Sequence, residues 1–202
     1  MRKATTLFLI IATFCSSFAQ TKRYSITDTT KINLEKIATQ FDIQNYFEDK
    51  DLSKKGEYKL LRKRKLVVQK EETKDNINYN LVFHSSDDTF ANFGSLDFNN
   101  IEGFTNKENT FYGLVFKNYT KLNDESFKEK IDYLQEKLGK PNYQFRDPMW
   151  DLVGKKLFSW KIKNLIYVAY LDYQDWLRLH IINFDKLKEI EKTELGWKLV
   201  DL

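Results

Sequence analysis

Residues 157–184 read LFSWKIKNLIYVAYLDYQDWLRLHIINF, and this stretch decides the fold. It contains three largely apolar runs, 157–163, 165–173 and 176–184. The dipeptides Lys163-Asn164 and Gln174-Asp175 separate them, and such short polar connections close tight hairpins. The pattern therefore predicts a three-stranded antiparallel meander. Its middle run is apolar on both faces, which is typical of a strand covered on both sides.

The segment before the meander predicts a helix over residues 124–138. Its apolar residues recur at i, i+4, i+7 and i+11, and they are Phe127, Ile131, Leu134 and Leu138. This spacing lines one face of a helix. Asn123 or Asp124 can accept the first backbone N–H groups, Gly139 suits the position after the last turn, and Pro141 prevents continuation.

The remaining elements are predicted from shorter patterns. Helical spacing of apolar residues indicates a short helix over 32–41 and a last amphipathic helix over 185–195. Residues 42–56 are mainly polar and are predicted as a loop with at most a turn of helix. Residues 58–69 and 77–84 predict a hairpin closed at Lys74-Asp75-Asn76. Two further strands are expected at 90–98 and 111–119, with a polar loop over 99–109 that contains Gly103.

Together these elements predict an α+β fold, in which an antiparallel sheet of hairpins and meanders packs against two to three amphipathic helices. We expect a single domain over 31–202, with a tandem helix-plus-strands arrangement of 31–119 and 124–202 as one form of it. The helix that ends in Leu138-Gly139-Lys140-Pro141 before a Trp-containing meander resembles small periplasmic helix-plus-sheet modules such as the β-lactamase-inhibitor-protein class. The resemblance covers element order alone and implies no function.

The first nineteen residues predict export. Arg2 and Lys3 precede the apolar run 7–14, and Ser17-Phe18-Ala19 places small residues before a cleavage site between Ala19 and Gln20. This is the layout of a signal peptide, and the apolar run is too short to be a transmembrane segment. Cys15 follows the bulky Phe14, whereas a lipoprotein cysteine follows a small residue, so a lipoprotein is disfavoured. Residues 20–30 are expected to form a flexible leader.

Composition excludes several functional classes. The chain has 33 Lys plus Arg against 29 Asp plus Glu, and the loss of Arg2 and Lys3 with the signal peptide brings the two nearly level. Such a small net charge gives no indication that the protein binds nucleic acid or an anionic membrane. Cys15 is the only cysteine, so the mature chain has no disulfide, no thiol nucleophile and no cysteine-ligated metal.

The most conspicuous cluster is basic. Between Lys54 and Lys70 eight residues are Lys or Arg and only Glu57 is acidic. The candidate binding residues within it are Lys59, Arg62, Lys63, Arg64 and Lys65. Since charges alternate across both faces of a strand, the segment indicates a sheet edge or a protruding hairpin. It could bind an envelope protein, an anionic glycan or a lipid headgroup, and export disfavours nucleic acid. The competing interpretation is a charged edge that prevents sheets from pairing.

The aromatic set of the meander is mainly predicted as core, because Trp160 is in phase with Phe158 and Ile162. Tyr173 and Trp176 are the exceptions. They flank the turn Gln174-Asp175, where burial is difficult, and they are candidate binding residues for a sugar or a protein.

Catalytic signals are weak. His84 precedes Asp87 and Asp88, but Ser and Asp at the end of a strand are typical of a turn, and His180 is predicted to be a packed or edge histidine rather than a catalytic base. Two acidic clusters, Glu48 to Asp51 and Asp97 to Glu102, do not meet the calcium-loop pattern, and no cofactor or metal motif is present. The sequence thus favours an exported bacterial binding domain without catalytic activity. The alternative is a small hydrolase or metal-dependent enzyme that uses His84 and the nearby aspartates.

Overall fold

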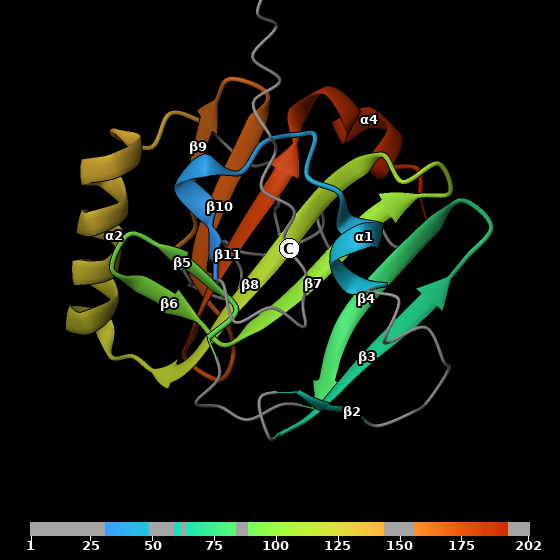
Figure 1. Cartoon of the computed structure of the whole chain (residues 1–202). Helices are drawn as coiled ribbons and strands as arrows, with labels where there is room; N and C mark the ends of the chain where they lie inside the picture. Colours follow the sequence, from blue (N-terminus) through green and yellow to red (C-terminus); the bar gives the residue numbers. More distant parts are fainter. Residues whose placement is uncertain (1–30, 49–58, 62–63, 84–88, 144–155, 194–202) are drawn as a thin grey trace, which may run out of the picture.

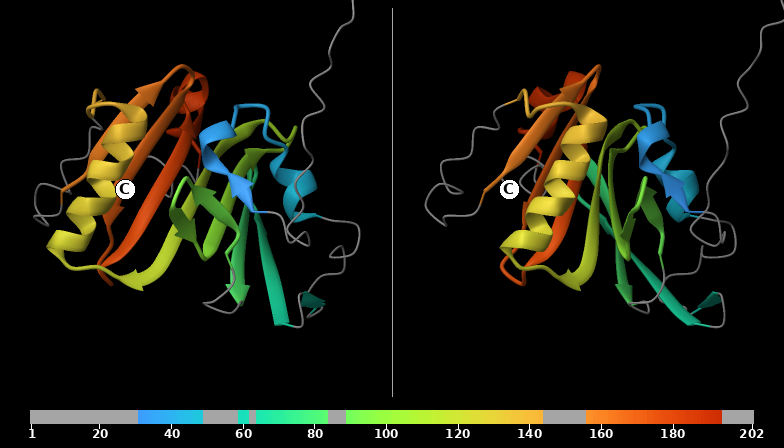
Figure 2. Two further views of the ribbon diagram at one scale, coloured as in Figure 1. Left: turned by 60° about the vertical axis from the view of Figure 1, so that its left-hand side comes forward. Right: turned by 90° about the vertical axis from the view of Figure 1, so that its left-hand side faces the viewer.

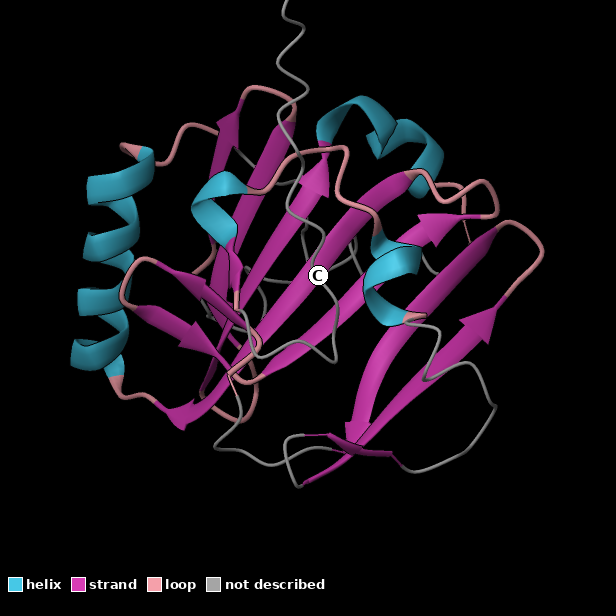
Figure 3. Cartoon of the chain, viewed as in Figure 1, coloured by secondary structure: helices cyan, strands magenta, loops and turns pink. Residues whose placement is uncertain are grey.

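A computed structural model describes residues 31–48, 59–61, 64–83, 89–143 and 156–193 (Figure 1). Its main feature is an eight-stranded sheet in which every neighbouring pair of strands is antiparallel. In spatial order the strands are β2 (Lys59–Leu61), β3 (Arg64–Glu72), β4 (Asn76–Phe83), β7 (Asn100–Asn106), β8 (Phe111–Lys121), β11 (Trp176–Asn183), β10 (Leu165–Leu171) and β9 (Phe158–Ile162). The predicted α+β fold with an antiparallel sheet is confirmed (Figure 3).

The predicted meander forms the last three strands of this sheet. Lys163 and Asp175, one in each connecting turn, have positive φ angles of 53° and 62°, which tight hairpin turns require. The chain leaves the sheet at the end of β8, returns at the far edge as β9, and comes back through β10 to pair β11 with β8. Strands of the two predicted halves therefore lie side by side in one sheet.

Helix α2 (Asp124–Leu138) has the predicted bounds. The Asn123 side chain accepts a hydrogen bond from the backbone N–H of Ser126, and Gly139 follows the helix with a φ of 84°. Phe127, Ile131 and Leu134 are buried against the sheet.

The predicted helix over 32–41 is wrong. Ile32–Asn33 forms strand β1, which pairs in parallel with β5 (Ala91–Phe93), and a single 3-10 turn, η1 (Leu34–Lys36), follows. The Asn33 side chain caps that turn by accepting from the backbone N–H of Glu35. Ile32 and Leu34 are both buried, and their spacing of two residues is that of a strand that enters a turn. The apolar pattern alone does not distinguish this arrangement from a short helix.

The strand predicted over 90–98 is broken into a hairpin. Its two strands, β5 and β6 (Leu96–Phe98), join through Gly94, which has a φ of 55°. With β1 they form a three-stranded sheet, and the backbone N–H of Ser95 donates to the Tyr133 hydroxyl of α2. This small sheet therefore contacts both the main sheet and α2.

The loop predicted over 99–109 is also wrong, because residues 100–106 form the central strand β7. Helix α1 (Ile43–Phe47), capped by Asp42, packs directly on it. A Cβ at Gly103 would lie 2.5 Å from Cε2 of Phe47 and 2.8 Å from Cγ2 of Ile43. Glycine at this position allows the close approach of the helix, rather than marking a loop.

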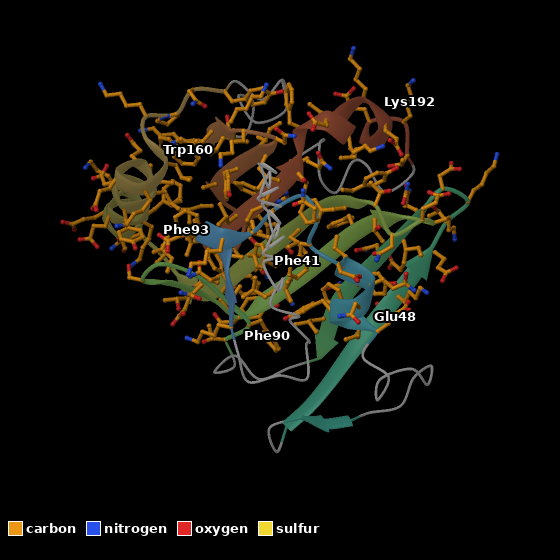
Figure 4. The ribbon with its side chains drawn as sticks, turned by 45° about the horizontal axis from the view of Figure 1, so that its top comes forward. Phe41, Glu48, Phe90, Phe93, Trp160 and Lys192 are labelled. Atoms are coloured by element: carbon orange, nitrogen blue, oxygen red, sulfur yellow. The ribbon has the colours of Figure 1, made fainter. Side chains whose placement is uncertain are left out.

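The two faces of the main sheet are covered differently. Helix α2, the small sheet and α1 cover the first face, which holds the larger core that includes Phe93 and Trp160 (Figures 2 and 4). The second face packs against η2 (Phe184–Lys186) and α4 (Leu187–Ile190) at one end of the strands. The last helix is thus shorter than the predicted 185–195, of which residues 194 and 195 lie outside the described residues. Within the described ranges, no helix combines the length and apolar character needed to cross a membrane.

Candidate functional site

The second face changes from apolar to polar along the strands. Near α4 it carries Phe104, Ile166 and Ile182, which pack with Ile190. Toward the opposite end, four residues lie directly opposite one another on adjacent strands, and we call them the polar row: Asn100 of β7, Lys117 of β8, Arg178 of β11 and Tyr170 of β10. Residues directly opposite each other share a face of the sheet. The polar row therefore places an amide, two cations and a phenol across four strands.

Each cation of the polar row has its own carboxylate. Lys117 forms an ion pair with Glu102 of β7, and the two side chains are only 15% and 11% exposed. Arg178 forms an ion pair with Asp172, with 2.6 Å between Nη2 and Oδ2. Since Lys117 and Arg178 face each other across β8 and β11, these carboxylates offset the repulsion between two neighbouring positive charges.

Asp172 also shapes the turn between β10 and β11. Its Oδ1 accepts hydrogen bonds from the backbone N–H groups of Gln174 at 2.8 Å and Trp176 at 3.1 Å. Its Oδ2 accepts from Nε of Arg178 at 2.7 Å. One carboxylate thus fixes the turn that presents Tyr173 and Trp176 and orients the guanidinium beside it.

The two aromatic residues predicted for binding lie at this turn. The Tyr173 side chain is 82% exposed, an unusual exposure for a large apolar residue. Trp176 is partly buried, and its ring lies 4.6 Å from that of Tyr119, centre to centre, at an angle of 65°. Burial raises the pKa of the Tyr119 phenol. Of the meander aromatics predicted as core, Trp160, Tyr167 and Tyr170 are buried, and Phe158 is partly buried against the same core.

His180 lies one row further toward α4 and is 2% exposed. Its Nε2 is 3.0 Å from the Tyr170 hydroxyl. Burial first, and then the positive charges of Arg178 and Lys117, hold the pKa of His180 well below 6.5. The ring is therefore neutral, and the prediction that His180 is packed agrees with this position.

Some polar atoms of this region have no hydrogen-bond partner. Among the described residues, these buried atoms include Oδ1 of Asn78, Oδ1 of Asn100 and Nδ1 of His180. Leaving such an atom without a partner costs about 1–3 kcal/mol. Because buried polar atoms without a partner are rare in folded proteins, their presence on this face sets it apart from the rest of the described sheet.

The basic cluster lies at the sheet edge. Lys59 belongs to the outermost strand β2, and Arg64 and Lys65 begin β3, where Lys59 pairs with Leu66 and Lys65 with Leu60. Arg62 and Lys63, between the two strands, lie outside the described residues. We call residues 59–65 the basic hairpin.

The basic hairpin and the aromatic turn are at the same end of the sheet but are not adjacent. Antiparallel pairing places the start of β3, the end of β4, the start of β7, the end of β8 and the start of β11 at one end. Three strands, β4, β7 and β8, separate β3 from β11. At about 4.8 Å per strand this amounts to roughly 19 Å, so the structure makes two separate candidate surfaces.

The candidate catalytic group falls outside the described residues, since His84, Asp87 and Asp88 all do. The enzyme alternative that depends on them stays a prediction. In the part of the chain that is described, no group of three or more His, Cys, Asp or Glu residues is placed to hold a metal ion.

Comparison with known proteins found no matching family model, no matching curated protein and no matching solved structure.

Sequence reasoning missed Glu102, Lys117 and Arg178. For Arg178 the sequence does offer a signal. It lies between Leu177 and Leu179, and because neighbouring residues of a strand point to opposite faces, its charge is expected on the face opposite the two leucines. Glu102 had no such signal, because residues 99–109 were predicted as a loop.

Proposed function

We propose that this chain is an exported binding protein of the bacterial cell envelope or extracellular space, without catalytic activity, and that the basic hairpin binds an anionic partner. The signal-peptide pattern of residues 1–19, with cleavage between Ala19 and Gln20, supports export. The ligand chemistry is a phosphate, sulfate or carboxylate group presented by a glycan or a lipid headgroup.

One observation supports this proposal most directly: β2 and β4, the two strands that pair with β3, contain no Asp or Glu. The backbone register thus places an apolar residue, not an acidic one, directly opposite Lys59, Arg64 and Lys65. Three other cations of the sheet have carboxylate partners. Lys70 pairs with Glu48 and Glu72, Lys117 with Glu102, and Arg178 with Asp172.

An excess of positive charge at a sheet edge attracts anions over about a Debye length, roughly 8 Å at physiological ionic strength. The same charge also prevents edge-to-edge pairing between molecules. Binding and edge protection make different predictions for a soluble anionic ligand, so they can be separated experimentally.

The test uses the chain from Gln20 to Leu202 and three probes: heparin, lipopolysaccharide, and vesicles of phosphatidylglycerol. One variant changes Arg62, Lys63, Arg64 and Lys65 to Gln. A matched control removes the same number of positive charges by changing four lysines on and after α2 to Gln: Lys128, Lys130, Lys137 and Lys140. Binding is measured by calorimetry for the soluble probes and by co-sedimentation for the vesicles, after circular dichroism has shown that each variant is folded.

We expect the hairpin variant to lose at least about tenfold in affinity for one probe, equivalent to about 1.4 kcal/mol, while the control changes little. Heparin or lipopolysaccharide alone would indicate a glycan, and vesicles alone a lipid headgroup. Equal losses in both variants, or no binding of any probe by the native chain, would leave the basic hairpin as a protected edge and refute the proposal. An acidic protein captured only by the native chain would indicate the envelope-protein alternative.

A further inference from the structure

We infer that residues 139–143, which we call the edge strap, close the β9 edge of the main sheet against strand addition. A second copy of this chain pairs with β9 when the edge strap is removed from it. The inference does not depend on the function proposed for the basic hairpin, which lies at the opposite edge of the sheet.

The position of β9 leaves hydrogen-bonding groups on its outer side. It is the last strand at one edge of the main sheet and pairs with β10 on its other side (Figure 1). In an antiparallel pair, alternate residues exchange hydrogen bonds with the neighbouring strand. The residues that flank the two-residue turn form such a pair, so Phe158, Trp160 and Ile162 bond toward β10. The backbone N–H and C=O groups of Ser159 and Lys161 therefore point outward, where a further strand would bind them.

The edge strap occupies these outward positions. The Asn142 side chain takes the place of a peptide group: its Oδ1 accepts from the backbone N–H of Lys161 at 2.7 Å, and its Nδ2 donates to the carbonyl of Lys161 at 3.4 Å. The carbonyl of Ser159 accepts from the backbone N–H groups of Asn142 and Tyr143 at 3.2 and 3.3 Å. The Ser159 hydroxyl donates to the carbonyl of Tyr143. A strand added to β9 needs the same donors and acceptors, so it can pair only if the strap leaves.

The strap is anchored at both of its ends. At one end, Nε1–H of the fully buried Trp160 donates to the carbonyl of Gly139 at 2.8 Å. At the other, the Tyr143 ring packs edge-on against Phe184, with 6.2 Å between ring centres. Asn142 between them is exposed. Changes at residues 142 and 143 can therefore loosen the strap while the buried anchor on Trp160 stays in place.

Charge gives β9 little protection of its own. Charged side chains are one means of preventing edge pairing, and the basic hairpin at the opposite edge carries several. In β9 only Lys161 is charged. If two β9 strands pair in antiparallel fashion about Trp160, Lys161 faces the second copy's Ser159, and no two charges lie directly opposite each other. The edge strap, rather than charge, therefore closes this edge.

The partner is a second copy because β9 is complementary to itself. In the pairing centred on Trp160, Ser159 of each copy exchanges N–H and C=O bonds with Lys161 of the other. Such a contact uses the same surface on both copies and consumes both exposed edges. The product is therefore a closed dimer rather than a filament.

The test measures self-association of residues 20–202 by sedimentation velocity over a range of protein concentrations. The open variant is Asn142→Ala with Tyr143→Ala, which removes the amide and the ring that hold the strap. The matched control is Asn164→Ala with Tyr173→Ala, the same two residue types at positions outside the strap. Circular dichroism first shows that each variant is folded.

A third variant adds Lys161→Pro to the open variant. Proline has no N–H, so it removes one of the outward bonds that a second copy needs. The N–H of Lys161 bonds to Asn142 and not to β10, so this change leaves the pairing of β9 with β10 in place.

We expect the open variant to dimerise with a dissociation constant at least about tenfold below that of the native chain and the control, equivalent to about 1.4 kcal/mol. Adding Lys161→Pro should restore the native behaviour. Hydrogen exchange gives a second readout. The Lys161 amide of the open variant should exchange faster than in the native chain at low concentration, and it should be protected again at high concentration, where the second copy pairs with it.

Two results would overturn the inference: an open variant that stays as monomeric as the native chain, or association that persists after Lys161→Pro, which would place the contact elsewhere. If the open variant does not fold, Asn142→Ala alone takes its place, because this exposed side chain contributes its two hydrogen bonds to Lys161. A dissociation constant unchanged in that variant would then refute the role of the strap. The open variant should keep any binding to heparin, lipopolysaccharide or vesicles, so this inference and the proposed function can fail separately.

Discussion

The hydroxyl of Tyr170 and Nε2 of His180 lie 3.0 Å apart on neighbouring strands. Burial and the nearby cations Arg178 and Lys117 keep the imidazole of His180 neutral. Burial alone disfavours the charged ring, and Arg178 and Lys117 disfavour it further, so the pKa of His180 lies well below 6.5. Burial also raises the pKa of the Tyr170 phenol, which therefore stays protonated. The pair is a neutral hydrogen bond inside a charged neighbourhood.

This relationship predicts that acid destabilises the protein before its carboxylates titrate. Below pH 6.5 the unfolded chain binds a proton at His180 and the folded chain does not, so the free energy of unfolding falls as the pH falls. Between about pH 8 and pH 5 the loss from this residue can reach at most about 2 kcal/mol, the limit set by the ordinary pKa of the unfolded histidine. Urea unfolding across this pH range measures it.

The chain provides a matched control for the pH effect, because it has only two histidines. His180→Gln should flatten the dependence of the unfolding free energy on pH, whatever its effect on stability at neutral pH. His84→Gln tests the other histidine and should leave the slope in place. If the slope instead disappears in His84→Gln and persists in His180→Gln, the buried neutral imidazole is not its source.

Gly103→Ala should destabilise the protein by about 1–3 kcal/mol through overpacking. The new Cβ would lie 2.5 Å from Cε2 of Phe47 and 2.8 Å from Cγ2 of Ile43, so α1 would have to move. Denaturant unfolding measures the change. The double variant Gly103→Ala with Phe47→Leu should cost less than the sum of the two single changes, because the smaller side chain makes room. Strict additivity would mean that this contact does not limit the fit.

The sequence was sufficient where one periodicity persisted for several residues. In α2 the apolar residues and both end signals agreed, and in the meander the apolar runs and the turn dipeptides agreed, so both were predicted within one or two residues at each end. These elements also determine the fold class. The meander forms an antiparallel sheet, and the apolar side of α2 must pack on one face of that sheet.

Prediction failed where the three-dimensional neighbours decide the local structure. Residues 100–106 contain Asn, Glu and Gly and were predicted as a loop, although they form a central strand. Gly103 is required by the approach of α1, and Glu102 is accommodated because Lys117 lies nearby on β8. Neither partner is close in sequence. The polar row was missed for the same reason, since its four members come from four strands.

Tyr79→Phe should lower the free energy of unfolding by about 1 kcal/mol, the net value of one hydrogen bond. The Tyr79 hydroxyl donates to Oε1 of Glu48 at 2.6 Å, and the ring stacks on Phe47 with 5.1 Å between centres, a contact that Phe retains. Denaturant unfolding measures the change, and Tyr173→Phe, at an exposed position, is the control that should change little.

The same change has a second readout in the titration of Glu48. Burial raises the pKa of this carboxyl, but hydrogen bonds from Lys70, Tyr79 and Gln44 outweigh burial and hold the pKa below 4.5. Without the Tyr79 hydroxyl, the pKa of Glu48 should rise toward its usual value, as measured by NMR titration. A fall in the pKa would contradict the proposed role of that hydrogen bond.

Replacing one member of the Lys117–Glu102 pair should cost more than replacing both. Either Lys117→Met or Glu102→Gln alone leaves a charge without its partner at a position only 11–15% exposed, and we expect a loss of about 2–3 kcal/mol for each. The double change removes both charges and should cost less than the sum, because no unpaired charge remains in a poorly hydrated position. A double-mutant cycle by urea unfolding measures the coupling. Full additivity would mean that Lys117 and Glu102 are solvated independently and do not stabilise the fold as a pair.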